Sequence, residues 1–263
     1  MSLTHLPTVL VTGASSGIGA VYADRFARRG HNLVLVARDK ARMETLATRL
    51  RAATGVSIDI LAADLTDIAE LGTVEKRLRE DDNIGILINN AGAAAPGSVK
   101  NPDLEAFDRL IRLNVTAVSR LAGVAGTRFA SRGEGAIINI SSIVALIPEL
   151  MLGIYGATKS YVLTLSQSLQ SELGPNGVYV QAVLPPATRT EIWERSGRSV
   201  DDLGVAMNVD ELVDAALVGF DRREPITIPS LPDEKQWETF NGARKAMLPN
   251  LPQKHAAERY RLQ

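Results

Sequence analysis

Thr8-Val-Leu-Val-Thr12 runs directly into Gly13-Ala14-Ser15-Ser16-Gly17-Ile18-Gly19 near the start of the chain. The first segment is short, apolar and β-branched, which predicts a buried strand. From Ala20 to Arg29 the sequence is typical of a helix, and Gly30 ends it. The glycines permit a tight turn, and the helix start offers unpaired N–H groups and a positive dipole end to a pyrophosphate. Strand, turn and helix together predict a dinucleotide-binding unit.

The spacing of these glycines is unusual for such a unit. It is Gly-x3-Gly-x-Gly, whereas the common dinucleotide fingerprint is Gly-x-Gly-x-x-Gly. No Lys-Ser/Thr pair follows, so the turn is not the phosphate loop of an NTPase. A cluster of glycines can also be a simple turn, and the interpretation therefore depends on the rest of the chain.

Strand-like and helix-like segments alternate along that remainder. Strands are expected at 32–37, 56–63, 84–89, 136–140, 178–184 and 226–229, and helices at about 39–53, 66–80, 101–130, 153–173 and 210–220. Repeated strand–helix–strand units predict an α/β fold, a doubly wound and mostly parallel sheet with helices on both faces. In the helix expected from 101, Asn101 would be the cap and Pro102 would suit the first turn.

Length and composition limit the class of protein. With 263 residues, 45% of them hydrophobic, the chain can bury one large core, so we expect a single domain over residues 1–263. The net charge of −1 without a basic run argues against nucleic acid as a partner. There is no cysteine, which excludes disulfides and a catalytic thiol, and no metal site is predicted. The polar start lacks a signal peptide and the apolar runs are too short to cross a membrane, so we expect a cytoplasmic protein.

A phenol and an ammonium group stand four residues apart in Tyr155-Gly156-Ala157-Thr158-Lys159, and Ser142 lies thirteen residues before the tyrosine. On a helix this spacing places Tyr155 and Lys159 on the same face. A phenol has a pKa of about 10, so a neighbouring cation that favours the phenolate would adapt it to acid–base work. Such pairs are also common on solvated helix faces, and this one gains its meaning from the other motifs.

Taken together, the motifs resemble one family. They are Thr12-Gly13-x3-Gly17-x-Gly19, Asn89-Asn90-Ala91-Gly92, Asn114, Ser142 and Tyr155-x3-Lys159, and their order and separations are similar to the short-chain dehydrogenase/reductase family, in its short single-domain branch. The resemblance runs from about Val9 to Thr190. It implies a seven-stranded Rossmann sheet, hydride transfer between a nicotinamide cofactor and a small-molecule carbonyl or alcohol, and a homodimer or homotetramer.

The resemblance also implies a catalytic set of Asn114, Ser142, Tyr155 and Lys159. Ser142 would orient the carbonyl and Tyr155 would supply the proton, while Lys159 would lower the phenol pKa and bind the nicotinamide ribose. The backbone of Asn114 would help to hold a water that reaches the lysine; alternatively, Asn114 is a buried and satisfied side chain. Ser141 competes for the serine role, but adjacent residues of an extended segment face opposite ways, and the family spacing selects Ser142.

The end of the second strand indicates which cofactor is used. An acid there holds the ribose 2′-hydroxyl of NAD, whereas a nearby arginine accommodates the 2′-phosphate of NADP. This chain has Ala37 at the acid's place and Arg38 directly after it. NADP(H) is therefore favoured over NAD(H), with Arg42 and a hydroxyl of Ser15 or Ser16 as further ligands of the phosphate. Alternatively, Arg38 and Arg42 are solvated charges beside a helix start.

Further cofactor contacts are implied by the resemblance alone. Asp64-Leu65 would contact adenine, although Asp64 could equally cap the helix that follows. Asn90 is expected to be mainly structural, with Ala91 and Gly92 as neighbours of the cofactor. The complete expected set is Gly13, Ser15, Ser16, Gly17, Ile18, Gly19, Arg38, Asp64, Leu65, Asn90, Ala91, Gly92, Tyr155, Lys159, Pro185, Thr188 and Thr190.

The segment after the sixth strand departs from the family. The family usually has Pro-Gly there, whereas this chain has Pro185-Pro186. Pro186 lacks an N–H and has a fixed φ angle, which would shift or stiffen the nicotinamide end. Thr188 and Thr190 are expected to contact the cofactor; alternatively, they are exposed loop residues.

Substrate clues lie in apolar stretches near the site. The loop 143–148 is markedly apolar, and a lid expected at about 191–208 adds Ile192, Trp193 and Met207. These residues favour an apolar carbonyl or secondary alcohol, although core packing explains them nearly as well. An acidic substrate stays open because of Arg189, Arg195 and Arg198. A C-terminal extension, at about 232–263, would pack over its own pocket or that of a neighbour.

Two function classes follow from these observations. The first is an NADP-dependent carbonyl reductase or alcohol dehydrogenase. The second is a catalytically silent NADP-binding protein that senses redox state. Ser142, Tyr155 and Lys159 are all present, which favours the enzyme, because a silent protein is expected to lose this set.

Overall fold

A seven-stranded sheet forms the centre of the fold, in the order β3-β2-β1-β4-β5-β6-β7. The computed structural model describes residues 6–94, 100, 102–150, 153–191 and 204–261. All pairs of neighbouring strands run parallel, which confirms the predicted doubly wound α/β sheet. The strands are β1 (Thr8–Thr12), β2 (Leu33–Ala37), β3 (Ile58–Ala62), β4 (Ile84–Asn89), β5 (Gly135–Ile140), β6 (Val178–Val183) and β7 (Ile226–Thr227).

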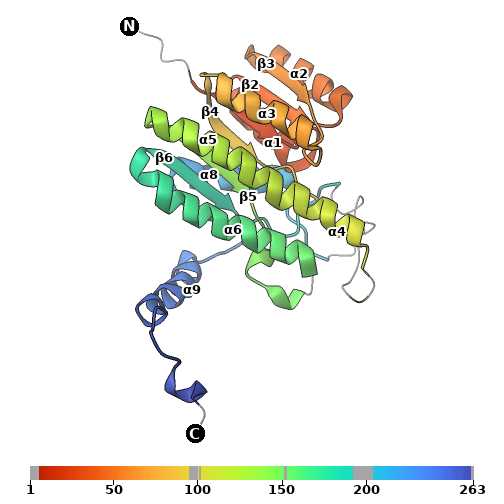
Figure 1. The fold of residues 1–263 in the computed structure, drawn as a ribbon. Helices are drawn as coiled ribbons and strands as arrows, with labels where there is room; N and C mark the ends of the chain where they lie inside the picture. Colours follow the sequence, from red (N-terminus) through yellow and green to blue (C-terminus); the bar gives the residue numbers. More distant parts are fainter. Residues whose placement is uncertain (1–5, 95–99, 101, 151–152, 192–203, 262–263) are drawn as a thin grey trace. The chain divides into compact units, whose positions relative to one another are not determined.

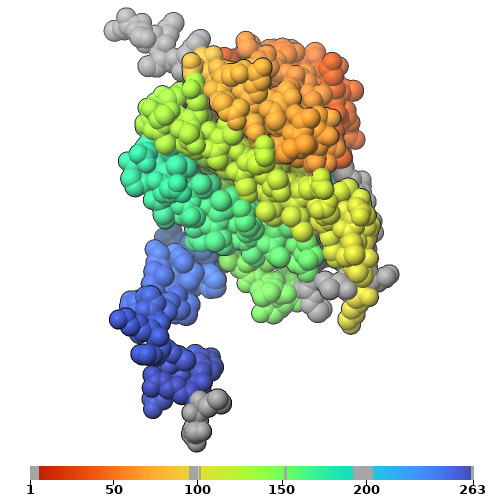
Figure 2. All heavy atoms as spheres, in the orientation of Figure 1, coloured from red at the N-terminus to blue at the C-terminus, as the bar shows by residue number. Residues whose placement is uncertain are grey.

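Helices cover both faces of this sheet (Figure 1). Side chains alternate between the faces of a strand, and in β1 Val9 and Val11 enter one apolar core while Leu10 enters the other. Helices α1 (Gly17–Arg28), α2 (Lys40–Thr54) and α8 (Val209–Asp221) complete the first core. Helices α3 (Ile68–Glu80), α5 (Val118–Arg132) and α6 (Gly153–Leu173) complete the second, and Figure 2 shows them as adjoining bands on one surface.

Short helical segments connect these elements. These segments are α4 (Leu104–Ile111), a π-helical turn η1 (Arg112–Ala117), and the 3-10 turns η2 (Ile143–Ala145), η3 (Pro148–Leu150) and η4 (Gly174–Asn176).

Among the described residues, no helix is both long and apolar enough to cross a membrane.

The strand order reverses at β1, which pairs with β2 on one side and β4 on the other. In an open parallel sheet the chain connections diverge at such a point and leave a crevice outside the carboxyl ends of the strands. The glycine turn follows β1 directly, and the segment 90–92 follows β4. The topology thus brings two of the sequence motifs together at this edge.

The helix expected from 101 to 130 differs from the prediction. Its first part, α4, begins at Leu104, and the side chain of Asp103 caps it by accepting from the N–H of Ala106 at 2.9 Å. Asn101, the predicted cap, lies outside the described residues. The helix then passes through the π turn before α5 continues to Arg132. Asp67 caps α3 in the same way, so the alternative role of Asp64 as that cap is wrong.

The chain divides into two compact units, Met1–Pro229 and Ser230–Gln263. The second contains the helix α9 (Glu234–Ala246) and the 3-10 turns η6 (Leu248–Asn250) and η7 (Glu258–Tyr260). None of its helices contains a buried residue, and within α9 the rings of Trp237 and Phe240 lie 5.6 Å apart between centroids. A single domain with an extension at 232–263 stays a prediction.

Candidate active site

Helix α6 carries the phenol and the ammonium group at the edge where the glycine turn lies. Tyr155 lies in its first turn and Lys159 one turn further along. The Lys159 Nζ atom lies 5.8 Å from the centroid of the Tyr155 ring and donates a hydrogen bond of 2.9 Å to the carbonyl oxygen of Ile140, at the end of β5. The two groups therefore share a face of the helix, as the spacing predicts.

Burial controls the protonation of both groups. It raises the pKa of Tyr155 to about 12, although a hydrogen bond from Ser142 opposes that rise. It also lowers the pKa of Lys159 to about 8. Desolvation of the phenolate thus outweighs the lowering influences in the chain by itself, and the expected lowering of the phenol pKa by Lys159 stays a prediction. At neutral pH Tyr155 carries its proton and can donate it.

The two serines at the end of β5 have separate roles. The Ser142 hydroxyl lies beside Tyr155 and donates to the carbonyl oxygen of Pro185 at 3.3 Å. It also accepts from the N–H of Val144 at 3.4 Å, at the start of η2. The Ser141 hydroxyl instead donates to the carbonyl oxygen of Lys159 at 2.7 Å. Ser141 therefore ties β5 to α6, and Ser142 is the serine that faces the phenol.

Asn114 lies in the π turn and is 1% exposed. Its side chain accepts from the N–H of Ala93 at 3.0 Å and donates to the carbonyl oxygen of the same residue at 2.9 Å. A further bond of 3.1 Å runs from its amide nitrogen to the Thr158 hydroxyl. The side chain is thus buried and satisfied, as the alternative interpretation holds, while the role of its backbone stays a prediction. Thr158 was not predicted from the sequence, which carries no signal for it beyond its place beside Lys159.

The first and third glycines of the turn are required by packing within the chain. Gly13 has a φ angle of +66°, and a Cβ atom there would lie 2.8 Å from Asn90 Nδ2 and 2.9 Å from Ala91 Cα. A Cβ at Gly19 would overlap Asn90 Nδ2 and the carbonyl oxygen of Gly13. Asn90 donates to the carbonyl oxygen of Thr12 at 2.8 Å, which fits the structural role expected of it. These two glycines therefore let β1 and β4 meet closely at the switch point.

Other expected cofactor residues meet at the same edge of the sheet. Gly17 has a φ angle of +55°, and a Cβ atom there would lie 3.2 Å from Thr190 Cγ2. A Cβ at Gly92 would lie 3.3 Å from Asn114 Oδ1 and 3.5 Å from Lys159 Nζ. The turn after β1, the end of β4, the segment after β6 and α6 thus converge. Such an opening, with glycine backbone and a helix N-terminus, suits a dinucleotide.

The segment after β6 is held by backbone pairing. Thr188 is buried, not an exposed loop residue, and its hydroxyl donates to the carbonyl oxygen of Pro186 at 2.9 Å. Ala187 and Arg189 on either side of it exchange backbone hydrogen bonds of 2.8 and 3.0 Å with Met207. Of the lid expected at 191–208, only residues 191 and 204–208 are described, so Ile192, Trp193, Arg195 and Arg198 lie outside the described residues.

Arg38 and Asp64 meet across the ends of β2 and β3. The Arg38 side chain is 72% exposed and lies 3.7 Å from the Asp64 carboxylate. Burial raises the pKa of Asp64, but hydrogen bonds from Thr66 and the charge of Arg38 outweigh it, so that this pKa lies below its ordinary value. Arg42, the second candidate for phosphate binding, forms an ion pair of 2.7 Å with Glu191. Arg38 is thus held more loosely than Arg42, and its role at a 2′-phosphate stays a prediction.

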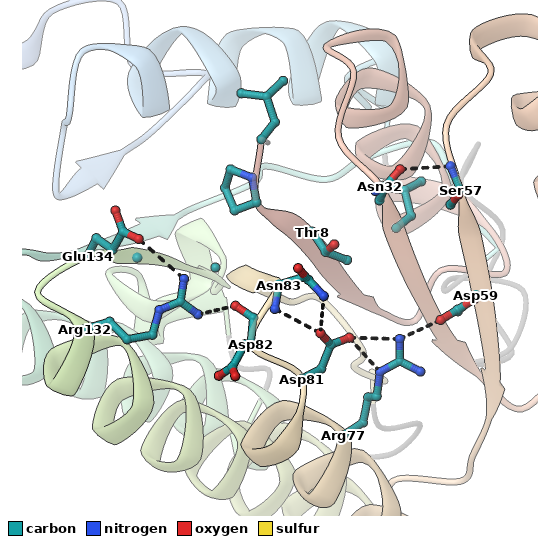
Figure 3. Close-up of a pocket in the computed structure, with 15 residues that line it drawn as sticks. Thr8, Asn32, Ser57, Asp59, Arg77, Asp81, Asp82, Asn83, Arg132 and Glu134 are labelled. Carbon is teal, nitrogen blue, oxygen red and sulfur yellow. Dashed lines mark hydrogen bonds and ion pairs between the residues drawn. The ribbon is translucent and has the colours of Figure 1, made fainter. Parts of the chain in front are cut away.

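The structure has one hollow away from this convergence and another beside it. One of about 650 Å³ opens at the amino ends of the strands, where its lining includes Thr8, the paired Arg77 and Asp81, and, beside Arg132, Glu134 (Figure 3). It lies at the opposite edge of the sheet from the carboxyl ends and contains none of the expected site residues. The other, of about 560 Å³, is lined by Ser15, Ser16, Gly17, Arg42 and Glu191 among others. It adjoins the glycine turn and lies next to the expected phosphate region.

Raising the pH from about 7 to about 9.5 should stabilise the cofactor-free protein by about 2 kcal/mol through Lys159. Burial lowers its pKa from 10.5 to about 8, so between these values the unfolded chain binds more protons and the free energy of unfolding rises with pH. Below the folded pKa of about 8, the folded and unfolded states both hold the Lys159 proton, and the full cost of burying the charged ammonium group destabilises the folded protein. Urea unfolding at both pH values measures the gain. An equal gain in Lys159→Met would assign it to other groups.

Known proteins resemble the chain over most of its length. A family model described as short chain dehydrogenase matches residues 7–201. A short-chain dehydrogenase from Sphingobium yanoikuyae, solved in complex with NADPH, is 59% identical with a TM-score of 0.96, over 97% of this chain and 100% of that one. The bulky-bulky ketone specific alcohol dehydrogenase from Comamonas testosteroni is 56% identical with a TM-score of 0.91, over 98% of this chain and 99% of that one.

Curated relatives are more distant and longer. Human 17-beta-hydroxysteroid dehydrogenase type 3 is 33% identical over 211 residues, which are 79% of this chain and 66% of that protein. A very-long-chain 3-oxoacyl-CoA reductase of Danio rerio is 36% identical, over 67% of this chain and 56% of that protein. The chain thus spans less than two thirds of the length of these curated relatives. Because the family model matches most of the chain and its motifs converge at one edge of the sheet, the chain belongs to the short-chain dehydrogenase/reductase family of oxidoreductases.

Proposed function

We propose that this chain is an NADP-dependent oxidoreductase that interconverts apolar ketones and secondary alcohols. The observation that carries the proposal is the meeting of Ser142, Tyr155 and Lys159, the last of them beside Gly92, at the edge where a dinucleotide would bind. A protonated phenol, a hydroxyl and a cation around one point are the groups that carbonyl reduction requires, since negative charge develops on the oxygen.

The nicotinamide cofactor, when bound, supplies the hydride. Ser142 would donate its hydroxyl hydrogen to the carbonyl oxygen and hold it beside Tyr155. The Tyr155 phenol would then give its proton to this oxygen, which its raised pKa allows at neutral pH. Lys159, whose Nζ lies close to Gly92, would contact the cofactor ribose and stabilise the phenolate left behind. Alcohol oxidation would use the same groups in reverse.

The preference for NADP rests on the end of β2. Ala37 leaves no carboxylate there to hold a ribose hydroxyl, and Arg38 stands next to it with most of its side chain exposed. The relative from Sphingobium yanoikuyae was solved in complex with NADPH, and its high identity to this chain supports the same choice here. The residues that would hold the cofactor are those of the glycine turn, Arg38, the segment 90–92, Lys159 and the segment after β6.

The choice of an apolar substrate rests on the loop after Ser142. Ile143 and Leu146 pack against the small core formed by Leu163, Ala182 and Leu184, so core packing explains them. Ile147 and Leu150 differ, because 38% and 49% of these residues are exposed. They are available to an apolar substrate. The relative from Comamonas testosteroni is specific for bulky-bulky ketones, which supports a ketone with two large substituents for this chain.

A panel of ketones and alcohols, followed by NADPH absorbance at 340 nm and repeated with NADH, tests the function. We expect turnover of aryl alkyl and diaryl ketones with NADPH and little turnover of short-chain ketones or of acidic 2-oxo acids. Tight NADPH binding without turnover of any carbonyl would instead favour the silent redox sensor. Preferred turnover of acidic substrates would contradict the apolar assignment.

Two properties complete the proposal. We keep a homodimer or homotetramer as the expected assembly, and the cytoplasm as the expected location. Size-exclusion chromatography with light scattering measures the first, and fractionation of the native host measures the second.

A further inference from the structure

In the sequence of α6, Thr158 lies between Tyr155 and Lys159, which are the proton donor and the cation of the proposed site. It precedes Lys159 directly and follows Tyr155 by three residues, and it is 3% exposed. Its hydroxyl donates to the carbonyl oxygen of Tyr155 at 2.8 Å and accepts from the side-chain amide of Asn114 at 3.1 Å. One hydroxyl thus joins the first turn of α6 to the π turn.

Asn114 is itself held by the loop after β4. Its side chain exchanges two hydrogen bonds with the backbone of Ala93, at 3.0 and 2.9 Å. The neighbouring Gly92 lies between Asn114 and Lys159, so closely that a Cβ atom would contact both. A continuous set of hydrogen bonds therefore runs from this loop, through Asn114 and Thr158, to the backbone of Tyr155.

The geometry points to Thr158 as a positioning residue of the proposed site: its hydroxyl holds the first turn of α6 against the π turn and thereby sets where Tyr155 and Lys159 stand. This inference rests on the proposed function. Thr158 does not touch substrate or cofactor in this role, and it acts through its neighbours. A helix end held only by its own turn is free to fray, whereas a buried bond to a fixed amide removes that freedom.

Removal of the hydroxyl should therefore act on geometry. In Thr158→Val the volume is nearly kept, but one N–H of the Asn114 amide loses its buried acceptor. The amide and the first turn can then relax away from each other. Because small displacements of reacting groups reduce rates steeply, we expect kcat to fall about tenfold with the KM for ketone changed less than about twofold.

Ser166 provides a matched control on the same helix. It is 1% exposed, accepts from the side-chain amide of Asn139 at 2.9 Å and donates to the carbonyl oxygen of Val162 at 2.7 Å. It thus repeats the chemistry of Thr158 further along the helix, away from the site. Ser166→Ala should lower the free energy of unfolding in the same way as Thr158→Val and leave kcat unchanged.

The test combines kinetics with a measurement that needs no turnover. Purified full-length protein is compared as wild type, Thr158→Val, Thr158→Ser and Ser166→Ala. The kcat and KM for ketone are measured with NADPH, and the titration of Lys159 is followed by NMR of labelled lysine, assigned with Lys159→Met. We expect Thr158→Val to lower kcat and to raise the apparent pKa of Lys159, because a loosened turn admits water. Thr158→Ser should restore both.

Each result of this test supports or overturns the positioning role of Thr158. In an active enzyme, a Thr158→Val variant with kcat within about twofold of wild type overturns the inference. If the wild type turns over no carbonyl, the proposed function fails, and the inference is then judged on the Lys159 titration alone: a shift in Thr158→Val but not in Ser166→Ala supports it, and equal titrations overturn it. If Thr158→Val does not fold, Thr158→Cys, which keeps the volume and weakens both bonds, takes its place.

Discussion

Tyr155→Phe should lower turnover at least about 10²-fold while keeping the fold and the binding of NADPH. The phenol is the proton donor of the proposed reaction, and phenylalanine retains its ring but has no proton to give. Ser142 keeps the carbonyl of Pro185 as a hydrogen-bond partner, so the substitution leaves no buried polar group without one. Steady-state kinetics with a ketone and NADPH, together with fluorescence titration of NADPH, measure the two effects.

Tyr161→Phe is the matched control for this experiment. Tyr161 lies on the same helix, is 42% exposed, and its hydroxyl meets that of Ser119 at 2.9 Å, away from the site. Tyr161→Phe should retain wild-type turnover, whereas near-normal turnover in Tyr155→Phe would contradict the mechanism.

Alcohol oxidation should accelerate as the pH rises toward about 12, because it needs the phenolate and burial raises the pKa of Tyr155 to about 12.

NADPH should bind about ten- to a hundredfold more tightly than NADH, because a charge-assisted bond to phosphate contributes about 1.5 to 3 kcal/mol. In the proposed function Arg38 would supply that bond. The double substitution Ala37→Asp with Arg38→Leu should reverse the preference, since a carboxylate at position 37 would accept from the ribose hydroxyls and repel a 2′-phosphate. Dissociation constants of both reduced cofactors, for the parent and the double variant, measure the change.

Arg79→Leu is the control for the loss of a positive charge. Arg79 is 59% exposed and lies on α3, where it pairs with Glu75. It should leave the ratio of the two affinities unchanged. Ala37 is buried at the end of β2, so the double variant is also checked by thermal unfolding. A parent that binds NADH as tightly as NADPH would show that Arg38 is a solvated surface charge.

Local patterns predicted much of this fold. The strand from Thr8 to Thr12 and the helix from 153 to 173 have the bounds expected of them. The helix after 101 was predicted less well: it begins at Leu104, where Asp103 caps it by accepting from the N–H of Ala106. The π turn left no local signal. It lets Asn114 reach the backbone of Ala93, which precedes it by twenty-one residues.

Contacts between distant segments account for the other differences. Arg42 pairs with Glu191, which is 149 residues away in the chain, while its contact with a phosphate stays a prediction. The Tyr155 pKa rises through burial, which the spacing to Lys159 does not indicate. Both effects depend on which groups the fold brings together and how completely it removes water from them. Neither quantity is present in the spacing of residues along the chain.

By itself, the sequence determined the repeating strand–helix units, the glycine turn and the pairing of Tyr155 with Lys159, because these arise from apolar periodicity, φ freedom and helical spacing between near neighbours. Three features arise when the chain folds: the pKa shifts of the two groups, the ion-pair partners of Arg38 and Arg42, and the place of Thr158 between Asn114 and α6. Desolvation and long-range hydrogen bonds exist only after β4, the π turn and α6 have packed together, and packing of that kind is a property of the whole fold.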